Sequence, residues 1–303
     1  MKCVNLDYLK QIEKIKLMAD FDGFPYEKKE GKSVSFITKL KKHASWRLSE
    51  RYNKYNGLQI NRSYNEWQED LYISEETRPS IAVYTCITSN YDIPKEPLVN
   101  LPNIDYYLFT DSETEIKSQN WKYTNINNLE IDEMMNLDNI QKNRFIKMHP
   151  HLFFKEYDYS LYVDGNVTVI SDVTPLTKSV NQEIGVALHR HNHRNCIYNE
   201  AKVLKILGKG NRDKINTQIN KYRLEGFPKQ FGLLEATIIL TDLKNQNSQI
   251  ILQSWWEEFL ESKSYRDQLS LPYVLWKSNA PIKKVGTLGV NLYRSSKFFI
   301  EHH

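Results

Sequence analysis

From residue 80 onward, the sequence alternates between short apolar runs rich in β-branched residues and longer stretches with helical spacing. The apolar runs are SIAVYTCIT from residue 80, IDYYLFTD (104–111), YSLYVDGNVTVI (159–170), EIGVALHRH (183–191) and LLEATIILTDL (233–243), with PIKKVGTLGVNLY (281–293) as a further edge strand. Near-continuous apolar runs of this length are typical of strands that are buried on both faces. The helical stretches are 139–155, 196–207, 211–223, 247–262 and 266–277. This alternation predicts an α/β domain whose mostly parallel sheet is flanked by helices.

The region before residue 78 has a different composition. It is polar and poor in strand-like runs, and segments 7–18 and 34–52 have helical spacing. Residues 26–55 contain nine Lys or Arg against three Glu. This basic helical surface either touches anionic lipid or a lipid-linked acceptor, or it is a solvated face packed on the main domain. We therefore expect a basic helical N-terminal extension over 1–77 and a second domain over 78–303.

Charge and cysteine usage exclude several classes of protein. The net charge of the 303 residues is +4, well short of a dedicated nucleic-acid binder but compatible with an anionic small-molecule ligand. Cys3, Cys86 and Cys196 are widely spaced and form no C-x-x-C motif, which disfavours a disulfide framework or a structural zinc site. The first residues carry charges where a signal peptide has an apolar core. These features predict a cytoplasmic protein, with the basic N-terminal region as the part that would touch the inner face of a membrane.

Polar residues follow the predicted strands at the points where the strands end. In open α/β sheets, ligands bind beyond the carboxyl ends of the strands. The residues in question are Thr88, Asn90, Tyr91 and Asp92 after the first strand, Asp111 after the second, Asp164-Gly165-Asn166 in the third, the His/Arg cluster after the fourth, and Glu235 in the fifth. The sequence has no G-x-G-x-x-G and no G-x-x-x-x-G-K-[ST], so a Rossmann dinucleotide site and a P-loop are both poorly supported.

The Asp164-Gly165-Asn166 segment has two interpretations. Carboxylate and amide oxygens at the end of an apolar strand can hold one hard divalent cation, and glycine lets the backbone turn tightly enough for both side chains to converge. Alternatively, Asp-Gly-Asn is a plain turn that joins two strands of a β-hairpin.

Four sequence blocks occur in the order that is typical of a known family. The blocks are YTCITSNYD (84–92), NRFIKMHPHLFFKEYDYSLYVDGNV (143–167), HRHNHRNCIYNEA (189–201) and RDQLSLPYVLWK (266–277). Together they resemble a glycosyltransferase-like domain family with the GT-A fold. The layout also resembles glycosyltransferase family 8, in which a metal-binding D-x-D precedes a D-Q motif. The resemblance spans residues 80–303, and the first 77 residues lie outside it.

The resemblance implies a metal site and a donor site. Asp164 would ligate a Mn²⁺ or Mg²⁺ ion that bridges the donor's diphosphate, and Asn166 occupies the second acidic place of D-x-D. His302 either completes the metal shell, as a late histidine does in family 8, or belongs to a tag-like tail. The residues that the resemblance assigns to donor binding are Thr85, Thr88, Asn90, Tyr91, Asp92, Asp111, Asp164, Gly165, His189 and Arg194.

The resemblance also implies the catalytic residues. Asp267 and Gln268 match the D-Q element near the transferred sugar, and Glu235 lies in the strand before it. Glycosyl transfer needs a carboxylate that either deprotonates the acceptor hydroxyl or shields the sugar cation. Asp267 and Glu235 are both candidates for that carboxylate, and the sequence does not separate them.

Two clusters of basic residues have alternative interpretations. The segment 189–194 could place histidines on zinc, use Arg190 and Arg194 to grip a diphosphate, or form a surface turn. Similarly, the helix with Lys142, Arg144 and Lys147 faces the donor in the family, but a solvated face would have the same composition.

These observations predict a metal-assisted glycosyltransferase of polysaccharide biosynthesis. The donor would be a nucleotide sugar, with a UDP-sugar as the default, and the acceptor a saccharide or lipid-linked glycan. Two other classes stay open: a nucleotidyl- or phosphotransferase that uses the same metal turn, and a non-catalytic glycan-binding module of the same fold.

Overall fold

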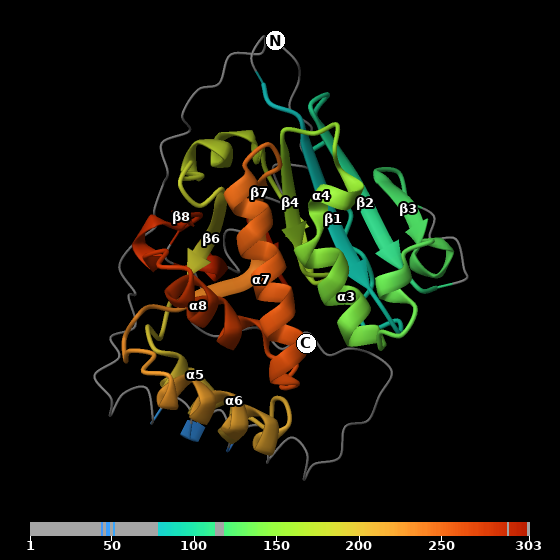
Figure 1. Ribbon diagram of the computed structural model, residues 1–303. Helices are drawn as coiled ribbons and strands as arrows, with labels where there is room; N and C mark the ends of the chain where they lie inside the picture. Colours follow the sequence, from blue (N-terminus) through green and yellow to red (C-terminus); the bar gives the residue numbers. More distant parts are fainter. Residues whose placement is uncertain are drawn as a thin grey trace.

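The computed structural model (Figure 1) describes Ala44, Arg47, Leu48, Arg51 and residues 78–112, 118–289 and 291–301. The first four of these are helical and exposed. The rest of the predicted N-terminal extension lies outside the described residues, as does His302. The boundary near residue 78 and the membrane contact of 1–77 therefore stay predictions.

A seven-stranded sheet forms the centre of the fold, in the order β3-β2-β1-β4-β7-β6-β8 (Figure 1). Its strands are β1 (Ile81–Ile87), β2 (Ile104–Thr110), β3 (Trp121–Asn125), β4 (Tyr159–Val163), β6 (Val186–Arg190), β7 (Leu234–Asp242) and β8 (Gly286–Thr287). All neighbours are parallel except at β7, which runs antiparallel to both β4 and β6. The predicted α/β class with a mostly parallel sheet is confirmed, and 281–293 supplies the predicted edge strand.

Helices and short strands cover the two faces of the sheet. The helices are α3 (Asn139–Met148), α4 (Pro150–Phe153), α5 (Ile197–Ile206), α6 (Arg212–Leu224), α7 (Gln246–Ser262) and α8 (Asp267–Lys277). The 3₁₀ turns are η2 (Ile126–Asn128), η3 (Asp132–Met134), η4 (Thr174–Ser179), η5 (Ile282–Lys284) and η6 (Leu292–Arg294), and β5 (Val167–Val169) pairs with β9 (Phe298–Ile300) as a second sheet. Among the helices of the described residues, none combines the length and the apolar character that crossing a bilayer requires.

Strand β1 shows how one run of residues supplies both cores. Ala82, Tyr84 and Cys86 face a cluster that includes residues of α3, α7 and α8. Ile81, Val83 and Ile87 face the opposite cluster, which includes residues of β5, β9 and η4. Successive side chains of a strand point to opposite faces, so a continuous apolar run can be buried on both sides. A third cluster lies between α5, α6 and α8.

The Asp164-Gly165-Asn166 segment is a turn but not the turn of a hairpin. The Val167 N–H donates to the Asp164 carbonyl at 3.0 Å, which closes the turn. However, β4 pairs with β1 and β7, whereas β5 pairs with β9, so the hairpin alternative is wrong. A Cβ on Gly165 would lie 2.9 Å from Asp92 Cβ and from Ile87 Cγ1. Glycine is therefore required because the turn packs closely against the chain that leaves β1.

Candidate functional site

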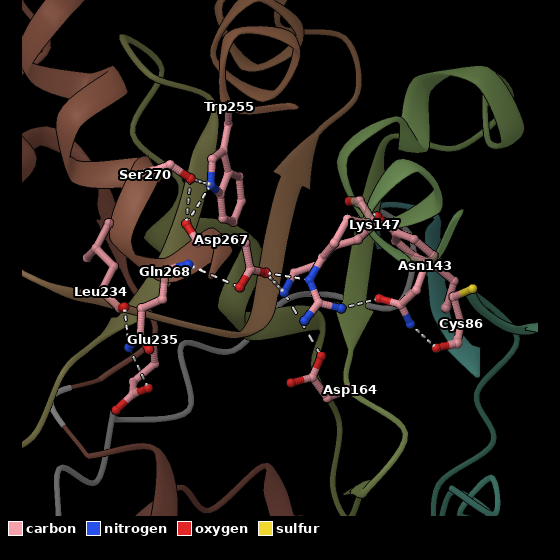
Figure 2. Close-up of polar contacts among 12 residues, drawn as sticks. Cys86, Asn143, Lys147, Asp164, Leu234, Glu235, Trp255, Asp267, Gln268 and Ser270 are labelled. Atoms are coloured by element: carbon pink, nitrogen blue, oxygen red, sulfur yellow. Dashed lines mark hydrogen bonds and ion pairs between the residues drawn. The ribbon is translucent and has the colours of Figure 1, made fainter. Parts of the chain in front are cut away.

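The reversed direction of β7 brings four strand ends to one edge of the sheet. The carboxyl ends of β1, β4 and β6 lie at this edge, and so does the amino end of β7, where Glu235 pairs with His189 in register. The Asp164 N–H donates to the Thr237 carbonyl at 3.0 Å, which fixes the turn after β4 beside the same part of β7. The first turn of α8 adds Asp267 and Gln268. Figure 2 shows Asp267 between Lys147 and Gln268, with Asp164 and Glu235 on the same side of it.

Asp267 is a buried carboxylate held by two cations from α3. Its Oδ2 accepts a hydrogen bond from Lys147 Nζ at 2.7 Å and lies 2.9 Å from Arg144 Nε. Only 8% of the Asp267 side chain is exposed. Burial by itself would raise the pKa of Asp267, but the charges of Arg144 and Lys147 outweigh it and hold that pKa well below its usual range. Asp267 is therefore ionised, and its charge is paired with Lys147 and Arg144.

Arg144 and Lys147 face Asp267 and not open solvent, so a solvated face is the wrong description of these two residues, whereas a contact of this helix with the donor stays a prediction. Lys147 is 2% exposed, lies over the ring of Tyr162 at 4.9 Å, and has its Nζ 4.0 Å from Asp164 Oδ1. Its ammonium group thus lies within reach of both Asp164 and Asp267. A buried ammonium needs such partners because losing its hydration is costly.

The turn after β4 offers two oxygen ligands. The Asp164 side chain is 36% exposed, in contrast to Asp267. The Asn166 amide donates from Nδ2 to the Glu301 carbonyl at 2.7 Å, and the Glu301 N–H donates back to the Asn166 carbonyl at 3.0 Å. This reciprocal pair fixes the orientation of the Asn166 amide and uses its donor side, so its oxygen is the atom that could face a cation.

The donor set of this turn fits one kind of metal ion. In the part of the chain that the structure describes, no three His, Cys, Asp or Glu side chains are grouped so that they could hold a metal. Asp164 and Asn166 together supply one carboxylate and one amide oxygen. Mg²⁺ is commonly bound by one or two carboxylates and completes its shell with water and substrate phosphates, and Mn²⁺ also suits oxygen ligands. Asp164 and Asn166 therefore fit such an ion.

The zinc alternative for 189–194 is wrong within the described residues, because the histidines there are not grouped with enough ligands to hold a metal.

Glu235 is the second carboxylate of the site, and its environment is opposite to that of Asp267. Its Oε2 accepts a hydrogen bond from Gln268 Nε2 at 3.1 Å, and its Oε1 lies 3.5 Å from His191 Nε2. Burial raises the pKa of Glu235 to about 7, with a further contribution from Glu200, although Arg194 and the Gln268 hydrogen bond oppose the rise. Glu235 can therefore gain or lose a proton near neutral pH.

Glu235 lies next to a buried group of side chains from the segment 191–200. Arg194 Nε lies 2.5 Å from Glu200 Oε2, and His191 Nε2 lies 3.5 Å from the same oxygen. The His191 Nδ1 accepts the backbone N–H groups of His193 and Arg194, each at 3.1 Å. Burial and then the charges of Arg194 and His193 lower the pKa of His191 well below its usual value, so the ring is neutral. Sequence reasoning missed His191 and Glu200 as site residues, although the block 189–201 contains both.

The loop after β1 borders the same edge. Asp111 accepts the Ser89 N–H with both carboxylate oxygens, at 2.9 and 3.0 Å, and Ser89 and Asn90 adopt left-handed φ values of 56° and 50°. Asp111 therefore shapes this loop. Tyr91 is 75% exposed, and Asp92 packs against the turn at Gly165. The predicted donor-binding residues of this loop and the predicted metal turn thus lie together.

Three predicted contacts need correction. His189 and Thr85 are 0% and 2% exposed within their strands, and the His189 ring lies 6.1 Å from the Phe298 ring. Neither offers an accessible atom to a donor, because both side chains point into the packed core. Arg190 donates to the carbonyls of Ile282 and Val285 at 2.8 and 2.9 Å, so it holds the chain before β8 and is not positioned for a diphosphate.

The chain is similar to a known protein family, to a curated protein and to a solved structure. The sequence model of the TOD1/MUCI70 glycosyltransferase-like domain family matches residues 11–298. The Arabidopsis thaliana protein described as "Probable hexosyltransferase MUCI70" is 23% identical over 283 residues, a match that covers 84% of this chain and 46% of that protein. Thus the chain spans less than half the length of this relative. The solved apo structure of the bifunctional glycosyltransferase WbbM matches with a TM-score of 0.41 and 11% identity, covering 71% of this chain and 40% of that one.

The extent of the family match corrects one prediction from the sequence. The resemblance was expected to begin at residue 80, but the match begins at residue 11. The family therefore extends into the region that precedes the α/β domain, where the sequence offered no motif.

Proposed function

Because this chain belongs to the TOD1/MUCI70 glycosyltransferase-like domain family, we propose that it is a hexosyltransferase that moves a sugar from a nucleotide-sugar donor to a saccharide or lipid-linked glycan acceptor. One observation carries the proposal beyond the family. Two carboxylates at the same strand edge, Asp267 and Glu235, have pKa values shifted in opposite directions. Pairs of this kind mark the separate acid–base and electrostatic roles of an active site.

The donor's diphosphate belongs beside the turn after β4 in this proposal. Asp164 and the Asn166 amide oxygen would hold Mn²⁺ or Mg²⁺, which when bound neutralises charge on the departing diphosphate. Arg144 and Lys147 add fixed positive charge at the same place, and Asp267 keeps both cations oriented. Preorganised charge of this kind stabilises a developing anion because it needs no rearrangement during the reaction.

Glu235 is the candidate base. As the acceptor oxygen bonds to the anomeric carbon and the bond from that carbon to the diphosphate oxygen breaks, the acceptor's hydroxyl proton passes to Glu235. A pKa of about 7 suits this transfer near neutral pH. Asp267 is unsuited to it, because two cations stabilise its ionised form. Gln268, which donates to Glu235 Oε2, orients the base.

The test is a thermal-shift panel of nucleotide sugars with and without Mn²⁺, followed by an assay for nucleoside diphosphate release. One nucleotide sugar should stabilise the protein, by about 2.7 kcal/mol at 100 times its Kd. Asp164→Asn should remove the Mn²⁺-dependent part of the shift, whereas the exposed control Asp132→Asn should not.

Other outcomes separate the alternative functions. Release of pyrophosphate would indicate a nucleotidyltransferase. Saccharide binding that survives Asp164→Asn, with no response to any nucleotide, would indicate a glycan-binding module. Either result would overturn the proposal.

A further inference from the structure

A hollow of about 530 Å³ lies between α5, α6 and the chain before β7. Figure 1 shows α5 and α6 together at one end of the molecule, beyond α8. The described residues that line the hollow include four cations, Lys202, Lys205, Arg223 and Lys229, and no Asp or Glu. Its volume falls in the range of roughly 300–1,000 Å³ that is typical of small-molecule sites.

Helix α5 separates this hollow from the candidate active site. Tyr198, Lys202 and Lys205 line the hollow at positions i, i+4 and i+7, which share one face of a helix. Glu200 is two residues from both Tyr198 and Lys202, so it lies on the opposite face, where it pairs with Arg194 behind Glu235. The hollow is therefore a separate site, about one helix diameter of roughly 10 Å from the acid–base cluster.

Two of these four cations pair with neutral amides. The Lys205 ammonium donates to the Asn216 amide oxygen at 2.7 Å, and the Arg223 guanidinium donates to that of Asn220 at 2.9 Å. By contrast, Lys221 on the same helix α6 pairs with two carboxylates, at 3.0 and 2.8 Å. The described residues of this concave surface therefore carry positive charge with no carboxylate among them, which produces a positive potential that attracts anions.

We propose that this hollow binds an acidic saccharide, a carboxylate-bearing stretch of the glycan acceptor at a distance from the transferred sugar. The four cations suit carboxylates, and the amides of Asn216 and Asn220 suit sugar hydroxyls. The choice of a saccharide rests on the proposed glycosyltransferase function. A single-stranded nucleic acid would also be attracted by the charge, but it needs aromatic rings on which bases can stack. Tyr198, the aromatic side chain among the described lining residues, is buried, with Arg223 over its ring at 5.3 Å and its hydroxyl donating to the Phe227 carbonyl.

Calorimetric titration of the full chain with a hexamer of α-1,4-linked galacturonate tests the proposal. Maltohexaose, a neutral hexamer, is the matched ligand. The acidic hexamer should bind at least tenfold more tightly than the neutral one, and its Kd should rise with salt. The double variant Lys205→Glu/Lys229→Glu should weaken binding of the acidic hexamer at least tenfold. The matched double variant Lys155→Glu/Lys244→Glu, which reverses two exposed charges elsewhere, should leave the Kd within twofold.

Three results would overturn the proposal: equal affinity for the two hexamers, unchanged affinity in Lys205→Glu/Lys229→Glu, or tighter binding of a twelve-nucleotide DNA strand that the same double variant abolishes. The last would assign the hollow to nucleic acid. The nucleotide-sugar thermal shift is measured on the same preparations, so the two proposals fail separately. Loss of that shift with intact hexamer binding refutes the transferase and leaves the saccharide site standing, and the reverse refutes the site alone.

Discussion

Replacing Glu235 with glutamine should produce a protein that is less active but more stable at alkaline pH. In the folded chain, burial and the neighbouring Glu200 raise the pKa of Glu235 from 4.5 to about 7. The folded state therefore resists ionisation of this group more than the unfolded state does. Its contribution to stability is complete below about pH 4.5 and is lost as the pH rises through 7. With 1.36 kcal/mol for each pH unit between the two pKa values, the loss amounts to about 3 kcal/mol.

Glutamine has nearly the same shape and does not ionise. Urea unfolding at pH 5 and pH 8 should show that wild type loses about 2.5 kcal/mol more than Glu235→Gln between the two conditions, because part of the loss has already occurred at pH 5. Since Glu235 is the candidate base, sugar transfer should fall about 100-fold or more in the variant, the range for a lost general base. The wild-type rate should also decline below pH 7, where Glu235 becomes protonated.

Glu156→Gln is the matched control, because Glu156 is exposed. It should change neither the pH dependence of stability nor the rate. The reasoning is refuted if Glu235→Gln shows the same pH dependence of unfolding as wild type, since Glu235 would then have an ordinary pKa. Full activity in a variant with the expected gain in stability would refute only the role of base.

Further substitutions test the parts that surround Glu235. Asp267→Asn should lower the free energy of unfolding by about 3–5 kcal/mol, because it leaves the Lys147 ammonium buried without the carboxylate 2.7 Å away. Urea unfolding measures this loss, and a loss below about 1 kcal/mol would contradict the ion-pair argument. Gly165→Ala should lower the free energy of unfolding by about 1–3 kcal/mol and weaken the nucleotide-sugar thermal shift, because the new Cβ would lie 2.9 Å from Asp92 Cβ. An unchanged thermal shift would mean that this turn does not contact the donor. Trp255→Phe should cost about 1–3 kcal/mol in thermal unfolding through the lost 2.8 Å hydrogen bond to the Asp267 carbonyl, and no loss would mean that this bond does not hold the start of α8.

Most of the sheet could be predicted because its strands are buried on both faces. Strand β1 is buried at all seven positions, so nearly every residue in it had to be apolar. Strand β3 was missed because WKYTN pairs with β2 alone and has one buried residue out of five. An edge strand of this kind needs few apolar residues, and periodicity therefore does not reveal it.

The direction of β7 could not be predicted from its sequence. The run from 233 to 243 is apolar whichever way the strand points, and direction is set by its pairing with β4 and β6. Direction nevertheless decides the site, because Glu235 stands near the amino end of β7. In a parallel strand that end would lie at the opposite edge from Asp164.

The buried environment of Lys147 could not be predicted from the residues around it in the sequence. Helix α3 buries four consecutive residues at its end, Phe145 to Met148, so no polar stripe marks where the lysine points. Its position depends on Asp267, which is 120 residues away in the sequence. Block order suggested that both segments belong to one family, but only the packed structure joins their charges.

The D-Q element explains why two neighbouring carboxylates can have opposite properties. Asp267 begins α8, and Oδ1 accepts the Gln268 N–H at 3.0 Å while Oδ2 takes the two cations. Gln268 turns the other way and donates its amide to Glu235 and to the Leu234 carbonyl. Both cations therefore interact with Asp267, whereas Glu235 accepts a hydrogen bond from the neutral amide of Gln268. If Gln268 were replaced by lysine, the new cation would lower the pKa of Glu235. The acidic limb of the rate profile would move to lower pH, whereas a purely structural role for Gln268 would change the rate without moving that limb.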